Sequence, residues 1–310
     1  MKIEESVLVF PGQGSQKIGM GKDLFENFAV AKDVFERVDE ALSFDLSKLM
    51  FEGEAEELNK TSNAQPAIMA TSMAYFEVLK NLGLIDLDDV KFMAGHSLGE
   101  YSALCASGSL SLEETAKLLK ARGEFMMQAC IDTPGAMAAI IGLDYDKVKR
   151  IADLSQCFVG NSNSPAQIVL SGRKEFVEQA CEKAKEQGAK RAVMLPVSGA
   201  FHSPLMQSAA DRMTDIILNA KVTEPQVKVV GNLTAKEYTS ADEIKDLLIK
   251  QITNTVKWQE SIVYMFENGG KNFIEVGFGN VLTGLVKKIV PEATTQTSDD
   301  VLLYAQKKGE

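Results

Sequence analysis

Short apolar runs alternate along the chain with segments of helical periodicity. Residues 6–10 form an apolar, partly β-branched run that stops at a Pro-Gly turn, and residues 90–94 form a second run that stops at a glycine. The stretch 61–66 carries a helix-capping signal with a proline in the first turn, and residues 101–106 indicate the first turns of a buried helix. Strands that alternate with helices are typical of a parallel sheet with helices on both faces.

The pattern changes after the Pro-Gly pair at positions 134 and 135. The elements that follow predict the order strand, helix, strand, strand, helix, strand, which is the split pattern of a ferredoxin-like unit. We expect a small inserted subdomain at residues 128–199 and a discontinuous large domain at residues 1–127 and 200–310. The predicted strands of the insertion are 137–143, 157–160, 167–170 and 192–197, with helices at 145–154 and around 176–184 and a turn at 161–165.

The main sheet resumes after the insertion, so the predicted fold class is α/β. The pattern after residue 199 predicts strands at 226–230 and 273–276 and helices at 241–251, 258–268 and from about 280 to 289. The second of these strands runs into glycines at positions 277 and 279, which indicate a sharp turn before the last helix.

The charge balance is acidic and changes which partners are expected. Lys and Arg number 33 and Asp and Glu number 43, so the net charge is −10 and the isoelectric point is about 5.0. A general nucleic-acid binder needs a large basic surface that neutralises phosphates. The composition therefore argues against nucleic acid as a partner, and an anionic partner must dock on a local basic patch.

The cysteines and the apolar runs indicate the cellular compartment in which we expect the protein. Cys105, Cys130, Cys157 and Cys181 show neither Cys-x-x-Cys spacing nor a cluster with histidine, which indicates a reducing compartment and no metal site. No apolar run approaches the roughly 20 residues that cross a bilayer. The first ten residues carry acids where a secretory signal is positively charged. We expect a cytoplasmic protein that does not bind a membrane.

Ser97 is the first candidate for chemistry. Residues 95–99 fit the pattern Gly-x-Ser-x-Gly, in which two glycines allow a sharp turn that pushes the serine hydroxyl outward. The predicted strand before the pattern and the predicted helix after it supply the required context. The alternative is an ordinary turn serine, but this context favours a nucleophile.

A serine nucleophile needs a base that takes its proton, and the chain has only two histidines. His96 is a doubtful candidate because neighbouring side chains at such a turn diverge. His202 follows the predicted strand at 192–197 and can therefore lie at the same rim of the sheet as Ser97. The alternative is a loop histidine whose hydrogen bonds are satisfied; the scarcity of histidines favours the base.

The tetrahedral intermediate of an acyl transfer also needs donors for its oxyanion. The backbone N–H of Leu98, directly after the nucleophile, is the natural first donor. A second donor is expected from a loop after another strand, and the backbone N–H of Gln13 lies in such a loop. A plain tight turn is the competing interpretation of that loop, which does not match the Gly-x-Gly-x-x-Gly dinucleotide pattern.

Taken together, these motifs resemble the malonyl-CoA:acyl-carrier-protein transacylase family of type II fatty-acid synthesis. The resemblance covers about residues 5–290, and it implies an α/β-hydrolase-like large domain with a parallel sheet and an inserted ferredoxin-like βαββαβ subdomain. Eight segments carry it in one order: 10–16 (FPGQGSQ), 65–67 (QPA), 95–100 (GHSLGE), 122–123 (RG), 163–165 with Gln167, 201–203 (FHS), Gln251 and 281–284 (VLTG).

The resemblance also implies roles for individual residues. Ser97 becomes the acylated nucleophile, His202 the general acid and base, and the N–H groups of Gln13 and Leu98 the oxyanion hole. Three further positions line the substrate site. Arg122 grips the malonyl carboxylate, although sequence alone would favour a solvated helix arginine; the backbone carbonyl of Gln251 orients the histidine; and Phe201 narrows the pocket, unless it only packs in the core.

The expected reaction is a ping-pong transfer of malonyl from malonyl-CoA to the phosphopantetheine thiol of acyl carrier protein, with no metal or redox cofactor. Two rival functions stay open, a serine hydrolase or thioesterase with the same Ser-His pair and a non-catalytic scaffold. The carrier protein is acidic in this family, so its docking needs local positive charge. By spacing alone, the candidate docking residues are Lys190, Arg191, Lys287 and Lys288, although lysine pairs usually lie on a solvated helix face.

Overall fold

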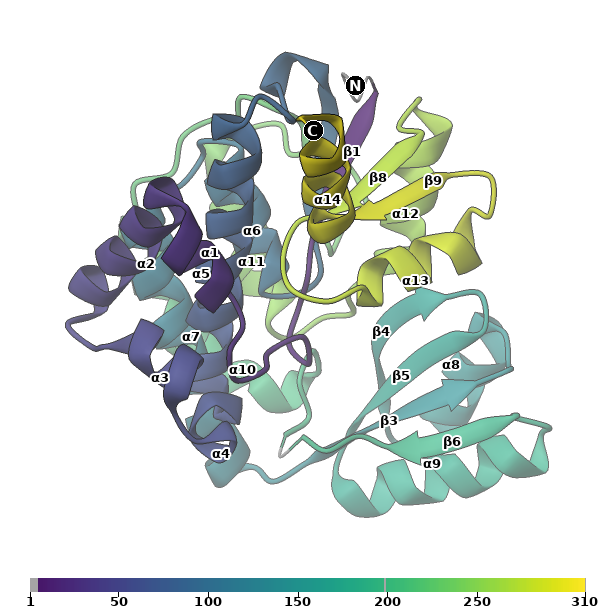
Figure 1. The fold of residues 1–310 in the computed structure, drawn as a ribbon. Helices are drawn as coiled ribbons and strands as arrows, with labels where there is room; N and C mark the ends of the chain where they lie inside the picture. The colour runs from purple at the N-terminus through teal and green to yellow at the C-terminus, as the bar shows by residue number, and fades with distance from the viewer. Residues whose placement is uncertain (1–4, 198, 310) are drawn as a thin grey trace.

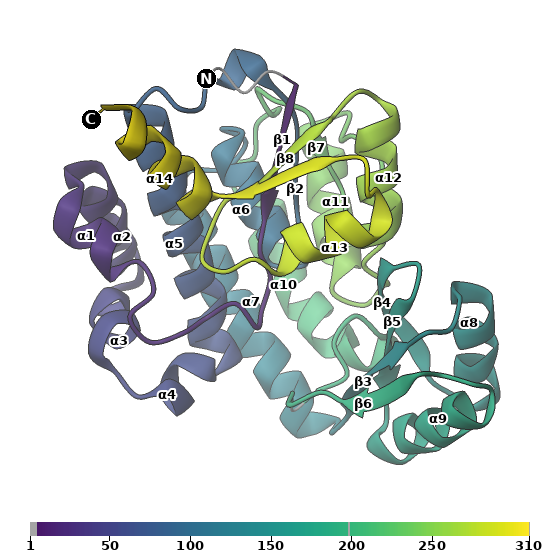
Figure 2. The same ribbon diagram turned by 45° about the vertical axis from the view of Figure 1, so that its right-hand side comes forward.

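The computed structural model describes residues 5–197 and 199–309, which form two sheets covered by helices (Figure 1, Figure 2). The larger sheet is parallel, as the sequence predicts, and has the strand order β7-β2-β1-β8-β9, so the first strand of the chain is central. Its strands are β1 (Ser6–Phe10), β2 (Val90–Gly95), β7 (Val229–Val230), β8 (Asn272–Glu275) and β9 (Thr294–Thr297).

Alternate residues of each strand point to opposite faces of this sheet, and both faces are apolar. Helices therefore cover both faces. Leu8 and Phe10 of β1 belong to one hydrophobic cluster, whereas Val7 and Val9 belong to a second cluster on the other face. The first cluster includes residues of α2, α5, α6, α7, α10 and α11, and the second includes residues of α12 and α13. The helices of this part are α1 (Lys22–Asn27), α2 (Ala29–Leu42), α3 (Leu46–Glu52), α4 (Ala55–Asn59), α5 (Thr61–Asn81), α6 (Gly99–Ala106), α7 (Leu112–Asp132), α10 (Gln207–Asn219), α11 (Ala241–Gln251), α12 (Trp258–Glu267), α13 (Val281–Ile289) and α14 (Ser298–Gly309), with 3-10 turns η1 (Leu87–Asp89) and η2 (Pro204–Met206).

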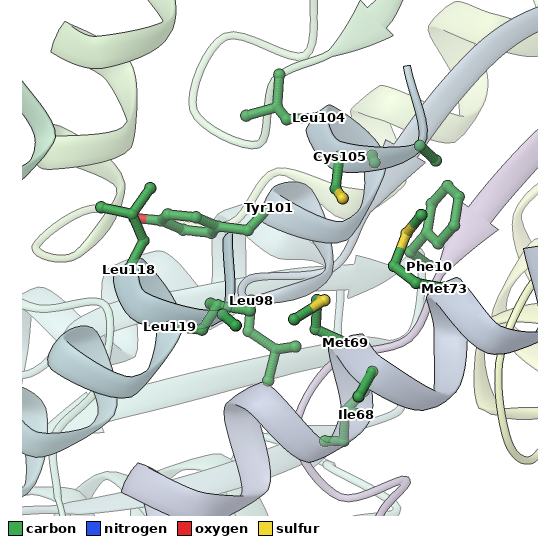
Figure 3. Packing of buried hydrophobic residues seen from close by; sticks show 14 of the residues in the cluster. Phe10, Ile68, Met69, Met73, Leu98, Tyr101, Leu104, Cys105, Leu118 and Leu119 are labelled. Carbon is green, nitrogen blue, oxygen red and sulfur yellow. The ribbon is translucent and has the colours of Figure 1, made fainter. Parts of the chain in front are cut away.

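Helix α6, which follows β2, is enclosed by the core. Figure 3 shows Tyr101 of α6 beside Leu118 of α7, and both side chains belong to the first hydrophobic cluster, as do Leu104 of α6 and Met69 of α5. All eight residues of α6 are buried. The turn between β2 and α6 is therefore held at both ends by buried elements.

The smaller sheet is antiparallel with the order β4-β5-β3-β6, which is the arrangement of a ferredoxin-like unit. Helices α8 and α9 share one hydrophobic cluster with its strands, and Figure 1 shows them on the side away from the larger sheet. The fold class predicted from the sequence is confirmed. The elements are β3 (Ala136–Ile141), α8 (Tyr145–Leu154), β4 (Phe158–Ser164), β5 (Gln167–Gly172), α9 (Lys174–Glu186) and β6 (Arg191–Met194).

Several predicted boundaries were wrong. Most of the predicted turn at 161–165 belongs to β4, because Asn161, Ser162 and Ser164 pair with β5; the isolated bridge between Asn161 and Val256 adds a contact on the other edge. Pro66 lies in the second turn of α5, because that helix already begins at Thr61. The strands predicted at 192–197 and 226–230 are shorter in the structure.

The turn around Ser97 packs directly against the loop after β1, with no side chains between the two backbones. A Cβ atom on Gly99 would lie 2.2 Å from the carbonyl oxygen of Phe10, and one on Gly95 would lie 1.9 Å from the carbonyl of Gly99. The N–H of His96 donates to the same Phe10 oxygen at 3.0 Å. The loop after β1 and the turn after β2 therefore form one packed unit that only glycine permits.

We predict that Gly99→Ala lowers the free energy of unfolding by about 2 kcal/mol or more, because the added methyl group must push apart two buried backbone segments. Urea denaturation measures this change. Gly284→Ala is the control, since a Cβ there meets nothing within 4 Å and the position is helical. That substitution should raise stability by up to about 1 kcal/mol. Equal stability of the two variants would contradict the close-packing account.

Candidate active site

Ser97 lies in the turn between β2 and α6, in a backbone conformation that few non-glycine residues adopt. Its φ of 54° is in the left-handed region. The N–H of Ser97 donates to Asn232 Oδ1 at 2.8 Å, and its carbonyl oxygen accepts from Gln251 Nε2 at 2.9 Å. Backbone strain of this kind gathers at functional sites, where surrounding contacts hold it. The hydroxyl is thus fixed at the carboxyl edge of the parallel sheet.

His202 meets this hydroxyl from a distant part of the chain. Its Nε2 lies 2.8 Å from Ser97 Oγ, and its Nδ1 lies 2.9 Å from the backbone carbonyl oxygen of Gln251. Because a carbonyl can only accept, Nδ1 carries the proton, so Nε2 presents a lone pair to the serine. Burial and the nearby charge of Arg122 lower the pKa of His202 to about 3, so the imidazole is neutral and ready to accept a proton.

Arg122 reaches the same hydroxyl from α7. Its guanidinium donates to Gln65 Oε1 at 2.7 Å, to Gln251 Oε1 at 2.8 Å and to Ser97 Oγ at 3.1 Å. The residue is only 1% exposed, which rules out the solvated arginine that sequence alone would favour. Its hydrogen-bond acceptors among the described residues are uncharged, and its Nε has no partner there.

A buried cation without a paired anion is costly, so this arrangement suits an anionic ligand. The loss of hydration lowers the pKa of Arg122 from its usual value, but a guanidinium stays charged at neutral pH. A guanidinium matches the geometry of a carboxylate, with two parallel hydrogen bonds. The site therefore joins a hydroxyl, a neutral imidazole and a buried guanidinium, a set that can serve chemically as nucleophile, base and receptor for a carboxylate.

The two expected oxyanion donors lie in the two loops that pack together. Gln13 follows Gly12, whose Cβ position is 2.6 Å from the carbonyl oxygen of His96, and Leu98 follows Ser97. Within the described residues neither backbone N–H donates a hydrogen bond. Both N–H groups therefore have no acceptor among the described residues, as the expected oxyanion donors require.

His96 and Phe201 have packing roles in this structure. His96 Nε2 lies 2.8 Å from Asn163 Oδ1 of β4, and its ring meets the edge of Trp258 at a centroid distance of 5.5 Å. Phe201, beside the base, is 8% exposed and belongs to the main hydrophobic cluster. Packing in the core, the alternative that the sequence left open for Phe201, is thus observed.

Two residues of the site were missed by sequence reasoning. Asn232 is fully buried and joins the Ser97 N–H to the carbonyl oxygen of Gly95 at 2.7 Å, which fixes the turn. Glu100 is 1% exposed and accepts hydrogen bonds from Asn232, Tyr238 and Gln251. The available signal for Glu100 was a carboxylate inside an apolar helical stretch. Asn232 gave no such signal, because a Gly-Asn pair after a strand is typical of an ordinary turn.

The rest of the described chain adds no second reactive cluster. Within residues 5–197 and 199–309 no three His, Cys, Asp or Glu side chains are grouped so that they could hold a metal ion. All four cysteines are free and buried. None of the helices in these ranges is long and apolar enough to cross a bilayer.

Comparison with known proteins agrees with this site. A family model for the acyl transferase domain matches residues 7–307. The malonyl CoA-acyl carrier protein transacylase of Bacillus subtilis is 46% identical over 91% of this chain and 89% of its own length. An acyl-carrier-protein S-malonyltransferase structure from Bartonella henselae is also 46% identical, with a TM-score of 0.93 and coverage of 98% of this chain and 100% of its own.

A third solved structure shows a relative bound to a protein partner. It is a malonyl-transacylase in complex with a type II polyketide synthase acyl carrier protein, 38% identical, with a TM-score of 0.94 and coverage of 98% of this chain and 100% of its own. These matches confirm the family resemblance that the motifs indicate. The chain belongs to the acyl transferase family and, within it, to the malonyl CoA-acyl carrier protein transacylases, and it is therefore an acyltransferase.

Proposed function

We propose that this chain transfers the malonyl group from malonyl-CoA to the phosphopantetheine thiol of an acyl carrier protein. The names of its relatives support this donor and this acceptor. One observation carries the proposal: Ser97 Oγ lies 2.8 Å from His202 Nε2 and 3.1 Å from a buried guanidinium whose partners are uncharged. A dyad alone would suit any acyl donor, whereas the arginine favours a donor that carries a carboxylate.

In the first half-reaction, His202 Nε2 takes the proton from Ser97 Oγ while the oxygen attacks the thioester carbon. The carbonyl electron pair moves onto oxygen, and the N–H groups of Gln13 and Leu98 stabilise that charge. When the carbonyl reforms, the carbon–sulfur bond breaks and His202 returns the proton to the sulfur of coenzyme A. Malonyl stays on Ser97 as an ester, with its carboxylate on Arg122.

The second half-reaction runs the same steps with a different thiol. His202 takes the proton from the phosphopantetheine thiol, and the sulfur attacks the ester carbon. The carbon–oxygen bond then breaks and Ser97 regains its proton, so the transfer is ping-pong and consumes no further reactant. Gln251 holds the imidazole through its backbone carbonyl, which takes the place of the acid in a catalytic triad.

The docking site of the carrier protein stays a prediction. The four basic candidates are exposed, as docking requires, and lie at two separate places in the fold. Lys190 and Arg191 lie at the start of β6, and Lys287 and Lys288 lie in the last turn of α13. The contacts with neighbouring residues do not favour one pair over the other.

We predict that Ser97→Ala abolishes the covalent malonyl adduct that forms when the protein is incubated with malonyl-CoA, because no other side chain at the site can form the ester. Intact-mass spectrometry measures the adduct directly. Ser203→Ala is the control, since this neighbouring buried hydroxyl donates to the carbonyl of Ala200 and not to the reacting atoms. An adduct that survives in Ser97→Ala would disprove the assigned nucleophile.

We predict that Arg122→Ala lowers the preference for malonyl-CoA over acetyl-CoA by about 10- to 100-fold, the value of charge-assisted hydrogen bonds to one carboxylate. The measurement is the rate of Ser97 acylation by each donor. Arg212→Ala is the control, because Arg212 is exposed on α10 and lies over the ring of Phe125. Full selectivity in Arg122→Ala would remove the carboxylate-binding role.

We predict that Ser97 keeps its reactivity at a pH where an ordinary histidine is protonated. The folded-state pKa of His202 is about 3 instead of 6.5, so the neutral base persists as the pH falls through 6.5 and is lost only toward 3. The rate of Ser97 labelling by an uncharged fluorophosphonate should therefore be constant from about pH 8 to about pH 5.5. A rate that halves near pH 6.5 would contradict the lowered pKa.

A further inference from the structure

Glu100 is a buried carboxylate that the proposed mechanism does not use. It lies in the first turn of α6, three residues after Ser97, and is 1% exposed. Its Oε1 accepts from the N–H of Asn232 at 2.7 Å and from the hydroxyl of Tyr238 at 2.6 Å, and its Oε2 accepts from Gln251 Nε2 at 2.6 Å. A carboxylate buried this close to a nucleophile needs a physical reason.

The contacts of Glu100 determine which way the Gln251 amide points. Gln251 Nε2 faces the Glu100 carboxylate at 2.6 Å, the carbonyl oxygen of Ser97 at 2.9 Å and, at 3.5 Å, Asn232 Oδ1, and none of these can donate when Glu100 is ionised. The amide oxygen must then point the opposite way, where it accepts from Arg122 Nη2 at 2.8 Å. A reversed amide would set its NH₂ group against the guanidinium, donor against donor.

The ionisation of Glu100 is compatible with this role. Burial raises its pKa to about 7, while the three hydrogen-bond donors and the charge of Arg122 act in the opposite direction. Above that pH the group is a carboxylate that can only accept. The orientation of Gln251 is then imposed by acceptors on one side and a cation on the other.

We propose that Glu100 is a positioning residue for the malonyl carboxylate: through the amide of Gln251 it aligns the Arg122 guanidinium beside Ser97. The inference rests on the proposed function, because it assumes that Arg122 binds the carboxylate of the acyl donor. The competing explanation is that Glu100 only ties α6 to the segment around Asn232 and Tyr238. That structural role would affect every acyl donor equally.

Glu100→Gln tests the difference because it keeps the shape and changes only the polarity. The new amide oxygen accepts from Asn232 and Tyr238, so its NH₂ group faces the NH₂ group of Gln251, and this repulsion displaces the Gln251 amide from its place beside Arg122. At about pH 8 we expect the preference for malonyl-CoA over acetyl-CoA to fall by about 10- to 100-fold, the loss that follows a misaligned charge-assisted contact. Ser97 acylation by acetyl-CoA and its labelling by an uncharged fluorophosphonate should change little.

Glu275→Gln is the matched control. Glu275 is also fully buried in the larger part of the protein, and burial raises its pKa as well. Its carboxylate accepts from backbone N–H groups at the start of α13, including those of Leu282 and Thr283, and the described contacts do not join it to Gln251. Thermal melting should show a loss of stability in both variants, but the ratio of malonyl to acetyl transfer should fall only in Glu100→Gln.

If Glu100→Gln does not fold, Gln251→Leu tests the same inference. It removes the amide through which Glu100 acts, together with that amide's hydrogen bond to the Ser97 carbonyl, and retains the backbone carbonyl that holds His202. The rates with both donors therefore fall, and the preference for malonyl-CoA over acetyl-CoA is expected to fall as with Glu100→Gln. An unchanged ratio in a folded variant, or an equal loss with both donors, overturns the inference. If the wild type forms no malonyl adduct at Ser97, the proposed function fails instead, and the two failures are therefore distinguishable.

Discussion

The buried charge of Arg122 is the constraint on which the rest of the site depends. A guanidinium that is 1% exposed and bonded only to the oxygens of two glutamines and a serine has lost its hydration without gaining a paired anion. The glutamines Gln65 and Gln251 come from α5 and α11, which hold the cation from two sides. The arrangement carries an electrostatic cost, and under the proposed function the malonyl carboxylate removes it.

The same packing places the reacting atoms. Ser97 and His202 both have a positive φ, 54° and 57°, and each is held in that conformation by contacts to other segments. The loop after β1 packs against the turn that carries Ser97 because Gly12 and Gly99 let two backbones approach closely. Preorganised donors and a neutral imidazole mean that little has to rearrange when the acyl group arrives.

Much of the fold and part of the site could be predicted from sequence because their signals are local. Ser97 stands in a five-residue pattern between a strand and a helix, and His202 stands out in a chain with two histidines. Arg122 and Gln251 needed the family resemblance, since a polar residue on a helix gives no local sign of burial. Glu100 and Asn232 were missed because only tertiary contacts reveal their partners. Strand β4 ran longer than predicted because its polar residues 161–164, which resemble a turn, pair with β5.

The most direct test of the account is a crystal structure of the protein after reaction with malonyl-CoA. We expect the malonyl group as an ester on Ser97 Oγ, with its carboxylate paired to the guanidinium of Arg122 and its carbonyl oxygen facing the N–H groups of Gln13 and Leu98. An acyl group on another residue, or a carboxylate turned to solvent while Arg122 keeps its present partners, would contradict the claim that the buried cation is reserved for the substrate.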